Sequence, residues 1–297
     1  MSLIEKAVER LEGLQPDPLK KSGSPVPRDN PPLPTRPGEA GADHRWAAPD
    51  TAGPAASRQA DIDVDRLAAA GFITQSATGS LIAEEFRVIK RPLLQNVLGG
   101  AAPVRNANLI MVTSSLPGEG KSFTAINLAM SIAMELDRTV LLVDADVARP
   151  SLPRVLGLPD QKGLLDVLQD KSLKLSDVLL RTNVDKLTVL LAGTQDAQAT
   201  ELLASEAMGR LLDDIARRYA DRIVIFDSPP LLMTTESRVL ASRMGQIVFV
   251  VRAEETPQNA IKEALGAIDA CPVKLMVLNQ ARNVENVAYG YDYGYGY

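Results

Sequence analysis

The chain has 297 residues, of which 45% are hydrophobic, 23% charged and 4% aromatic, and its formal net charge is −5. This composition suffices for one globular core, and the acidic balance argues against general nucleic-acid binding, which needs a basic face to neutralise phosphates. A single cysteine (Cys271) and a single histidine (His44) exclude a disulfide framework, a Cys/His zinc site and a histidine-based acid–base mechanism in the core.

Residues 1–15 have the pattern of a short amphipathic helix. Ser2 and Glu5 fit a capping box, and apolar residues recur at helical spacing from Leu3 to Leu14. The polar face carries three glutamates against one lysine and one arginine, a balance that anionic lipid does not favour. We therefore expect a helix that docks on a protein partner.

Residues 16–79 are predicted to form a disordered or partly polyproline linker. Ten of the 20 prolines lie between Pro16 and Pro54, among few large apolar side chains, so the segment cannot compensate for its ordering entropy. The chain shows no signal peptide and no apolar run near 18 residues, so we expect a cytoplasmic protein that does not span a membrane.

From residue 80 onward, short apolar runs alternate with helical patterns. Residues 80–97 read as a helix in which Pro92 is expected to cause a kink or stop. Continuous apolar runs predict strands at 109–114, 139–144, 186–193, 222–227, 246–251 and 274–279. The helices expected between them include 122–136, 200–219 and 257–270. Unbroken apolar strands separated by helices predict an α/β fold with a mostly parallel sheet covered on both faces, and ligands that bind beyond the carboxyl ends of the strands.

The run TSSLPGEGKSF (113–123) follows the first of these strands and opens a helix, as a phosphate-binding loop does. Its glycines let backbone N–H groups approach a polyphosphate, and the helix N-terminus adds partial positive charge. Lys121 is expected to reach the β- and γ-phosphates and Ser122 to coordinate Mg²⁺. The predicted nucleotide contacts are Ser115, Pro117, Gly118, Glu119, Gly120, Lys121, Ser122, Phe123 and Asn279. Ser115 stands where the general pattern has its first glycine.

Three aspartates follow two other predicted strands. Asp144 and Asp146 lie at and beyond the end of VLLVDAD, and Asp227 ends IVIFD. Two carboxylates close to a triphosphate repel it unless a cation lies between them, and Mg²⁺ supplies that cation. Asp227 occupies the usual position of a magnesium-ordering carboxylate in phosphate-loop nucleotidases.

These three motifs, followed by a tyrosine-rich C-terminus, resemble the bacterial tyrosine kinases of exopolysaccharide export, most closely the stand-alone autokinases of exosortase-associated loci. The resemblance covers residues 80–297 and implies a deviant phosphate-loop NTPase fold over 80–285 with Mg·ATP-dependent autophosphorylation. It also implies catalytic roles for Lys121, Asp144, Asp146 and Asp227, with Ser122, Asp144 and Asp227 at the metal and Asp144 activating the attacking phenol. Ala148 departs from the family pattern, which often has arginine at that position.

The resemblance further implies partners. A membrane chain-length-determinant protein would act as activator, at the inner face of the membrane, and a cognate tyrosine phosphatase would reverse the reaction. A homo-oligomeric ring would form through a helix motif represented here by Glu84, Arg87 and Lys90; an ordinary charged helix face explains these three residues equally well. Lysine lacks the bidentate fork of arginine.

The flexible tail, residues 286–297, supplies the phosphoacceptors in this interpretation: Tyr289, Tyr291, Tyr293, Tyr295 and Tyr297. Three glycines within nine residues argue against a strand interior. Two other interpretations stay open. A partitioning or division-site ATPase has the same fold, but usually carries a signature lysine where this chain has Ser115 and Leu116. A nucleotide-binding scaffold without transfer activity would use the tail for stacking on a partner.

Overall fold

The computed structural model describes residues 58–281, apart from 78, 100–102 and 220. The expected docking helix 1–15 and the phosphoacceptor tail 286–297 lie outside the described residues, as does the expected linker before residue 58. None of the helices in the described part of the chain has the length and apolar character that a bilayer-spanning segment requires.

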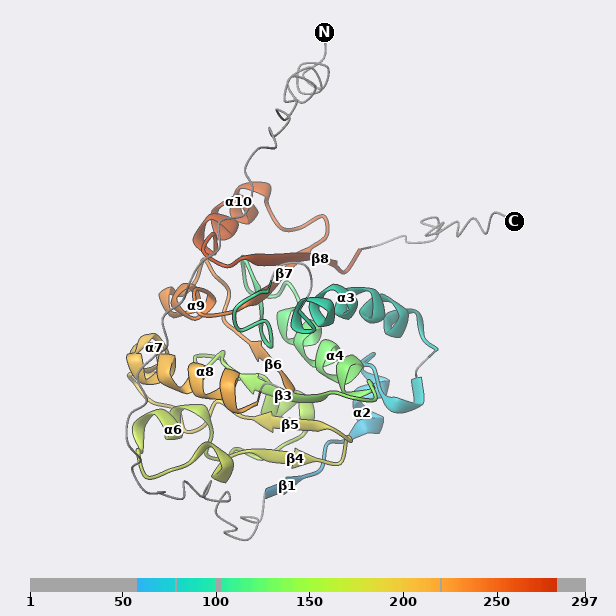
Figure 1. Ribbon diagram of the computed structural model, residues 1–297. Helices are drawn as coiled ribbons and strands as arrows, with labels where there is room; N and C mark the ends of the chain where they lie inside the picture. The colour runs from blue at the N-terminus through green and yellow to red at the C-terminus, as the bar shows by residue number, and fades with distance from the viewer. Residues whose placement is uncertain (1–57, 78, 100–102, 220, 282–297) are drawn as a thin grey trace, which may run out of the picture. The chain divides into compact units, whose positions relative to one another are not determined.

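An eight-stranded sheet forms the centre of the fold (Figure 1). Its strand order is β1-β4-β5-β3-β6-β2-β7-β8, and only the β4–β5 pair is antiparallel. The strands are β1 (Arg58–Ala60), β2 (Leu109–Ser114), β3 (Thr139–Asp144), β4 (Leu180–Thr182), β5 (Leu187–Leu190), β6 (Arg222–Asp227), β7 (Gln246–Arg252) and β8 (Val273–Asn279). The predicted mostly parallel α/β sheet is therefore confirmed.

Helices cover both faces of the sheet (Figure 1). One face packs against α2 (Val64–Ala69), α3 (Leu81–Val97), α4 (Lys121–Ala133) and α5 (Leu152–Leu156). The other packs against α6 (Leu164–Gln169), α7 (Ala199–Ala204), α8 (Glu206–Arg218), α9 (Thr235–Ala241) and α10 (Gln258–Ala267). Two short 3-10 helices complete the described elements, η1 (Gln75–Ala77) and η2 (Leu175–Asp177).

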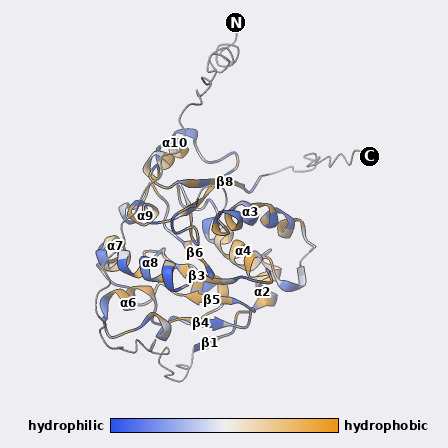
Figure 2. Cartoon of the chain, in the orientation of Figure 1, coloured by the Kyte–Doolittle hydropathy of each residue, from blue (hydrophilic) through white to orange (hydrophobic). Residues whose placement is uncertain are grey.

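The continuous apolar runs are explained by this double cover. In β2, Ile110 and Val112 belong to one buried layer, while Leu109 and Met111 belong to the other. Successive side chains of a strand point to opposite faces, so a strand covered on both faces has no side that faces water and is mostly apolar. In the hydropathy colouring, the central strands are accordingly apolar (Figure 2).

One helix differs from its predicted form, whereas the helix predicted over 80–97 is confirmed as α3. The helix expected over 200–219 is divided at Ser205, whose extended backbone caps α8 and whose hydroxyl accepts a hydrogen bond from the Met208 N–H. Pro92 does not end α3, which continues to Val97. Proline lacks the N–H that would donate a hydrogen bond to the carbonyl of Val88. Val88 lies on the exposed side of the helix, where water can donate that hydrogen bond instead.

The prediction that residues 58–79 belong to a disordered linker is wrong for residues 58–77. Strand β1 pairs in parallel with β4, and Ile62 exchanges two backbone hydrogen bonds with the side chain of Asn183. Leu67 and Ile73 are buried in the same core as α4, and the Ile73 N–H donates to Asn127 Oδ1 at 2.7 Å. A short strand and single-turn elements give too few apolar residues for a local pattern, and their burial depends on partners over fifty residues away.

Replacement of a core leucine in this segment tests its place in the fold. Leu67→Ala is expected to lower the free energy of unfolding by about 2–5 kcal/mol, because Leu67 is 1% exposed and its truncation leaves a cavity. Leu136→Ala is the matched control, since Leu136 is 85% exposed, and should change stability by less than about 0.5 kcal/mol. Equal urea midpoints for the two variants would show that residues 58–77 do not contribute to the core.

Candidate functional site

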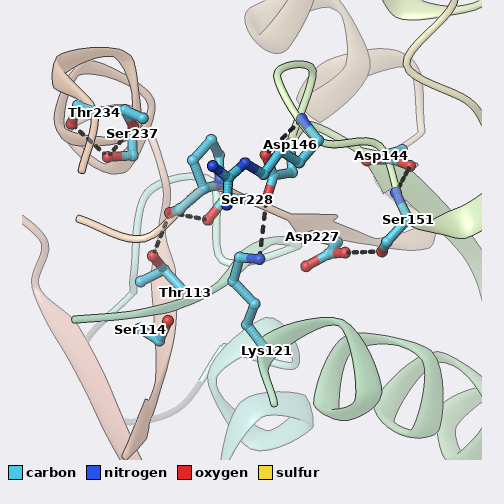
Figure 3. Close-up of polar contacts among 12 residues, drawn as sticks. Thr113, Ser114, Lys121, Asp144, Asp146, Ser151, Asp227, Ser228, Thr234 and Ser237 are labelled. Atoms are coloured by element: carbon cyan, nitrogen blue, oxygen red, sulfur yellow. Dashed lines mark hydrogen bonds and ion pairs between the residues drawn. The ribbon is translucent and has the colours of Figure 1, made fainter. Parts of the chain in front are cut away.

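The predicted site residues meet at the carboxyl ends of three neighbouring strands. Strands β3, β6 and β2 lie side by side in that order, and Asp144 is in register with Asp227. The loop that follows β2 opens directly into α4, whose first residue is Lys121. The parallel sheet therefore assembles residues that are separated by over a hundred positions in the sequence, as Figure 3 shows.

Two glycines allow the backbone conformation of the loop. Gly118 and Gly120 have φ values of 85° and 95°, a region that other residues rarely adopt. A Cβ on Gly120 would lie 1.9 Å from the side-chain amide of Asn279, so this position also needs the absence of a side chain. Ser115 has no positive φ and is fully buried, so a small residue satisfies the turn where the general pattern has glycine.

Glu119 is buried within the loop and its carboxylate points away from the loop's exposed tip. Oε2 accepts from the Leu116 N–H at 2.6 Å, and Oε1 accepts from the Thr256 hydroxyl. The Asn279 amide donates to the Glu119 carbonyl at 2.9 Å. Glu119 and Asn279, both predicted nucleotide contacts, thus tie the loop to the segment after β7 and to the end of β8.

Lys121 forms an ion pair with Asp146, with 2.9 Å between Nζ and Oδ2 (Figure 3). The Oδ2 atom of Asp144 accepts from the backbone N–H groups of Ser151 and Leu152 at 3.1 and 3.0 Å. The Ser151 hydroxyl donates to Asp227 Oδ2 at 3.2 Å. One cation and three carboxylates therefore share a small, largely buried volume.

Burial disfavours the ionised form of these carboxylates. It raises the pKa of Asp144 to about 8, with the neighbouring carboxylate of Asp227 as the second cause. It also raises the pKa of Asp227 to about 6, although Lys121 and a hydrogen bond from the Ser122 hydroxyl favour ionisation there. The site is therefore built to receive additional positive charge.

The donor set fits Mg²⁺ bound together with phosphate. The Oδ1 atoms of Asp144 and Asp227 are buried and accept no hydrogen bond from the residues that the structure describes. Within that part of the chain, no three His, Cys, Asp or Glu side chains are placed to hold a metal ion by themselves. Mg²⁺ commonly takes only one or two protein carboxylates and completes its shell with water and substrate phosphates.

The remaining predicted residues lie elsewhere. The Phe123 ring packs on Phe72, with centroids 4.9 Å apart. On α3, Glu84 and Arg87 form an ion pair with each other. Lys90 was expected at the ring interface, but it is 7% exposed, and its Nζ contacts Ser131 O at 2.7 Å and Glu135 Oε1 at 2.5 Å.

Within one chain Lys90 faces the adjacent helix, and its assignment to an intersubunit contact stays a prediction. Successive helical residues are rotated by about 100°, so Lys90 points about 120° away from Glu84, toward the adjacent helix α4. Sequence reasoning also missed Ser151 and Thr256. Both are loop residues with no motif around them; a serine before the short helix α5 was the only local signal for Ser151.

Asparagine in place of Asp144 is expected to stabilise the protein in the absence of divalent cations. The folded-state pKa of Asp144 lies above its ordinary value of 3.8, so its unfavourable contribution is absent at low pH and grows as pH rises toward about 8. With EDTA present, Asp144→Asn should exceed the wild type in unfolding free energy by about 1–3 kcal/mol at pH 8, and by much less at pH 5.

Urea titrations at the two pH values measure this difference. Asp160→Asn, at an exposed loop carboxylate, is the control and should follow the wild type at both. A pH-independent difference between Asp144→Asn and the wild type would contradict the burial of a titrating charge.

Comparison with known proteins agrees with this geometry. The family model described as ParA, NUBPL iron-transfer P-loop NTPase, matches residues 105–261, more than half of the chain. Tyrosine-protein kinase YwqD of Bacillus subtilis is 32% identical over 74% of this chain and 90% of its own length. The succinoglycan biosynthesis transport protein ExoP of Rhizobium meliloti is 33% identical over 65% of this chain, which spans only 24% of ExoP.

Among solved structures, the kinase domain of VpsO is 28% identical, with a TM-score of 0.56 over 68% of this chain and 100% of that domain. The match to YwqD extends over nearly that protein's whole length. The chain therefore belongs to the P-loop NTPases of the ParA type and, among them, to the bacterial tyrosine-protein kinases.

Proposed function

We propose that this chain is an Mg·ATP-dependent tyrosine autokinase that phosphorylates its own C-terminal tyrosine cluster and acts in exopolysaccharide synthesis or export. The observation that carries the proposal is the convergence of Lys121, Ser122, Asp144, Asp146 and Asp227 at the mouth of a glycine-shaped loop. YwqD is named a tyrosine-protein kinase, and ExoP is named a transport protein of succinoglycan biosynthesis.

Different groups of the chain bind the phosphates and the metal ion in this proposal. Backbone N–H groups of residues 118–122 face the phosphates, and Lys121 exchanges its partner Asp146 for phosphate oxygens. Ser122, Asp144 and Asp227 would hold Mg²⁺, which would supply positive charge to neutralise the phosphates of the nucleotide. The raised pKa values of both carboxylates favour this, because a cation relieves the cost of their buried charge.

Asp144 also receives the proton of the attacking tyrosine. A phenol has a pKa near 10 and is a weak nucleophile until a carboxylate accepts its hydrogen bond. The phenolic oxygen bonds to the γ-phosphorus, the bond from that phosphorus to the bridging oxygen of ADP breaks, and the proton passes to the carboxylate and then to water. The donor is ATP, and the acceptors are Tyr289, Tyr291, Tyr293, Tyr295 and Tyr297.

Regulation is proposed through partners. The segment 1–15 would dock on a membrane chain-length-determinant protein, which places a cytoplasmic chain at the inner face of the membrane. Glu84, Arg87 and Lys90 on α3 are the candidates for contacts in a homo-oligomeric ring. A tyrosine phosphatase would remove the phosphates from the tail. Each phosphate adds about −1.5 to −2 charge, so a modified tail would loosen such an assembly by repulsion.

A ParA-type ATPase without transfer to protein is the second candidate, because the family model that matches residues 105–261 is of that type. The partitioning enzymes usually carry a signature lysine early in the loop, where this chain has Ser115 and Leu116. Transfer to tyrosine separates the two functions, since an ATPase releases phosphate and leaves the mass of the chain unchanged.

Substitution of the loop lysine tests the kinase assignment. Purified wild type with Mg·ATP should gain one or more increments of phosphate mass, mapped to residues 283–297, whereas Lys121→Met should lose at least about 100-fold in rate. Because Lys121 pairs with buried Asp146, the thermal midpoint must be measured alongside. Lys262→Met, at an exposed residue of α10, is the matched control and should react like the wild type. Normal labelling of folded Lys121→Met would refute the assignment.

Mixing two inactive or acceptor-free chains tests transfer between subunits. One chain carries Lys121→Met and keeps its tail; the other keeps Lys121 and has phenylalanine at all five tail tyrosines. Transfer between subunits should label only the Lys121→Met chain, at a rate that rises with concentration. Absence of label in the mixture, together with wild-type labelling that is independent of dilution, would mean that the reaction is intramolecular.

A further inference from the structure

The phosphate loop carries one acidic side chain, Glu119, in the middle of the segment that is proposed to face the phosphates. Glu119 lies between Gly118 and Gly120 and is only 3% exposed. A carboxylate attached to this backbone is an anion that the loop's N–H groups could bind in place of a phosphate. The direction in which this side chain points therefore bears on nucleotide binding.

The two carboxylate oxygens of Glu119 have different partners. Oε2 accepts from the Leu116 N–H at 2.6 Å, which shows that the carboxylate already binds one N–H group of its own loop. Oε1 accepts from the hydroxyl of Thr256, which lies 137 residues further along the chain. The Thr256 hydroxyl is therefore the contact that holds this carboxylate to a part of the protein outside the loop.

The Thr256 hydroxyl is itself held in place. Its oxygen accepts from the Arg252 N–H at 3.0 Å, and the Thr256 N–H donates to the Arg252 carbonyl at 3.1 Å. Arg252 ends β7, and β7 pairs with β2, the strand that leads into the phosphate loop. A hydroxyl has a single hydrogen to donate, and here it goes to Glu119. Only serine or threonine at position 256 can make both contacts in this way.

The backbone of Glu119 is held independently of its side chain. The Asn279 amide donates to the Glu119 carbonyl at 2.9 Å, and the Asn279 carbonyl accepts from the Ala253 N–H at 2.9 Å. Loss of the Thr256 hydroxyl would therefore release the carboxylate of Glu119 and leave these backbone contacts of the loop in place.

We propose that Thr256 is a positioning residue for nucleotide binding, because its hydroxyl holds the Glu119 carboxylate away from the N–H groups that the phosphates need. This inference rests on the proposed binding of Mg·ATP. A released carboxylate would compete for those N–H groups and would repel the anionic ligand. The hydrogen bonds of Thr256 go to Glu119 and Arg252, so its loss should weaken binding and leave the transfer step unchanged.

Removal of the hydroxyl in the full-length chain tests this inference. Thr256→Val keeps the shape of the side chain, and it should raise the Kd for Mg·ATP, measured by calorimetry, about tenfold, since a hydrogen bond to a charged group is lost. The kcat for tail labelling at saturating ATP should stay within about twofold of the wild type's. Thr256→Ser keeps the hydroxyl and should restore the Kd. Thr194→Val is the matched control, because it removes a threonine hydroxyl that donates to Asp166 at 2.8 Å, and should bind Mg·ATP like the wild type.

A second background separates the charge of Glu119 from a simple tether of the loop. In Glu119→Gln the side chain keeps its size and carries no charge, so adding Thr256→Val should change the Kd by less than about twofold. A tenfold rise in both backgrounds would mean that the hydroxyl only fastens the loop, and would overturn the inference.

An unchanged Kd in Thr256→Val, or no recovery in Thr256→Ser, would overturn it as well. Thr256→Ala also lacks the hydroxyl, is smaller than valine, and takes the place of Thr256→Val if the thermal midpoint shows that valine disturbs the fold. Failure of the wild type itself to bind Mg·ATP would overturn the proposed function, and this inference with it.

Discussion

The burial of two carboxylates side by side, Asp144 and Asp227, is the constraint on which the rest of the site depends. Neither ionises without cost, and the pKa of each is raised by burial. The protein offsets part of this cost with backbone N–H groups at Asp144 and with the Ser151 hydroxyl at Asp227. A bound cation would relieve what remains, and this is the physical basis of the Mg²⁺ site that we propose.

The phosphate loop is held by contacts with Thr256 and Asn279, which the loop's own sequence does not predict. Glu119 carries the negative charge that might be expected to repel a triphosphate, yet its carboxylate is turned inward to Leu116 and Thr256. Asn279 approaches the loop so closely that only glycine fits at position 120. The loop therefore presents its backbone to the ligand, while its one acidic side chain fastens it to the segment after β7.

The order of the strands makes the sheet asymmetric about the phosphate loop. The phosphate loop follows β2, whose neighbours in the sheet are β6 and β7, whereas β8, the last strand that the structure describes, lies at one edge of the sheet. This asymmetry arises from the order in which the strands pair.

The sequence by itself determined the central strands and the loop, because a strand buried on both faces must be apolar throughout and a phosphate loop needs glycine at fixed positions. It also indicated which aspartates end their strands. Tertiary structure alone decided that residues 58–77 belong to the core, that Lys90 faces Ser131 and that Ser151 bridges two carboxylates. These features depend on partners distant in sequence, and a short strand, one turn of helix or a single loop serine leaves no periodic pattern from which such partners follow.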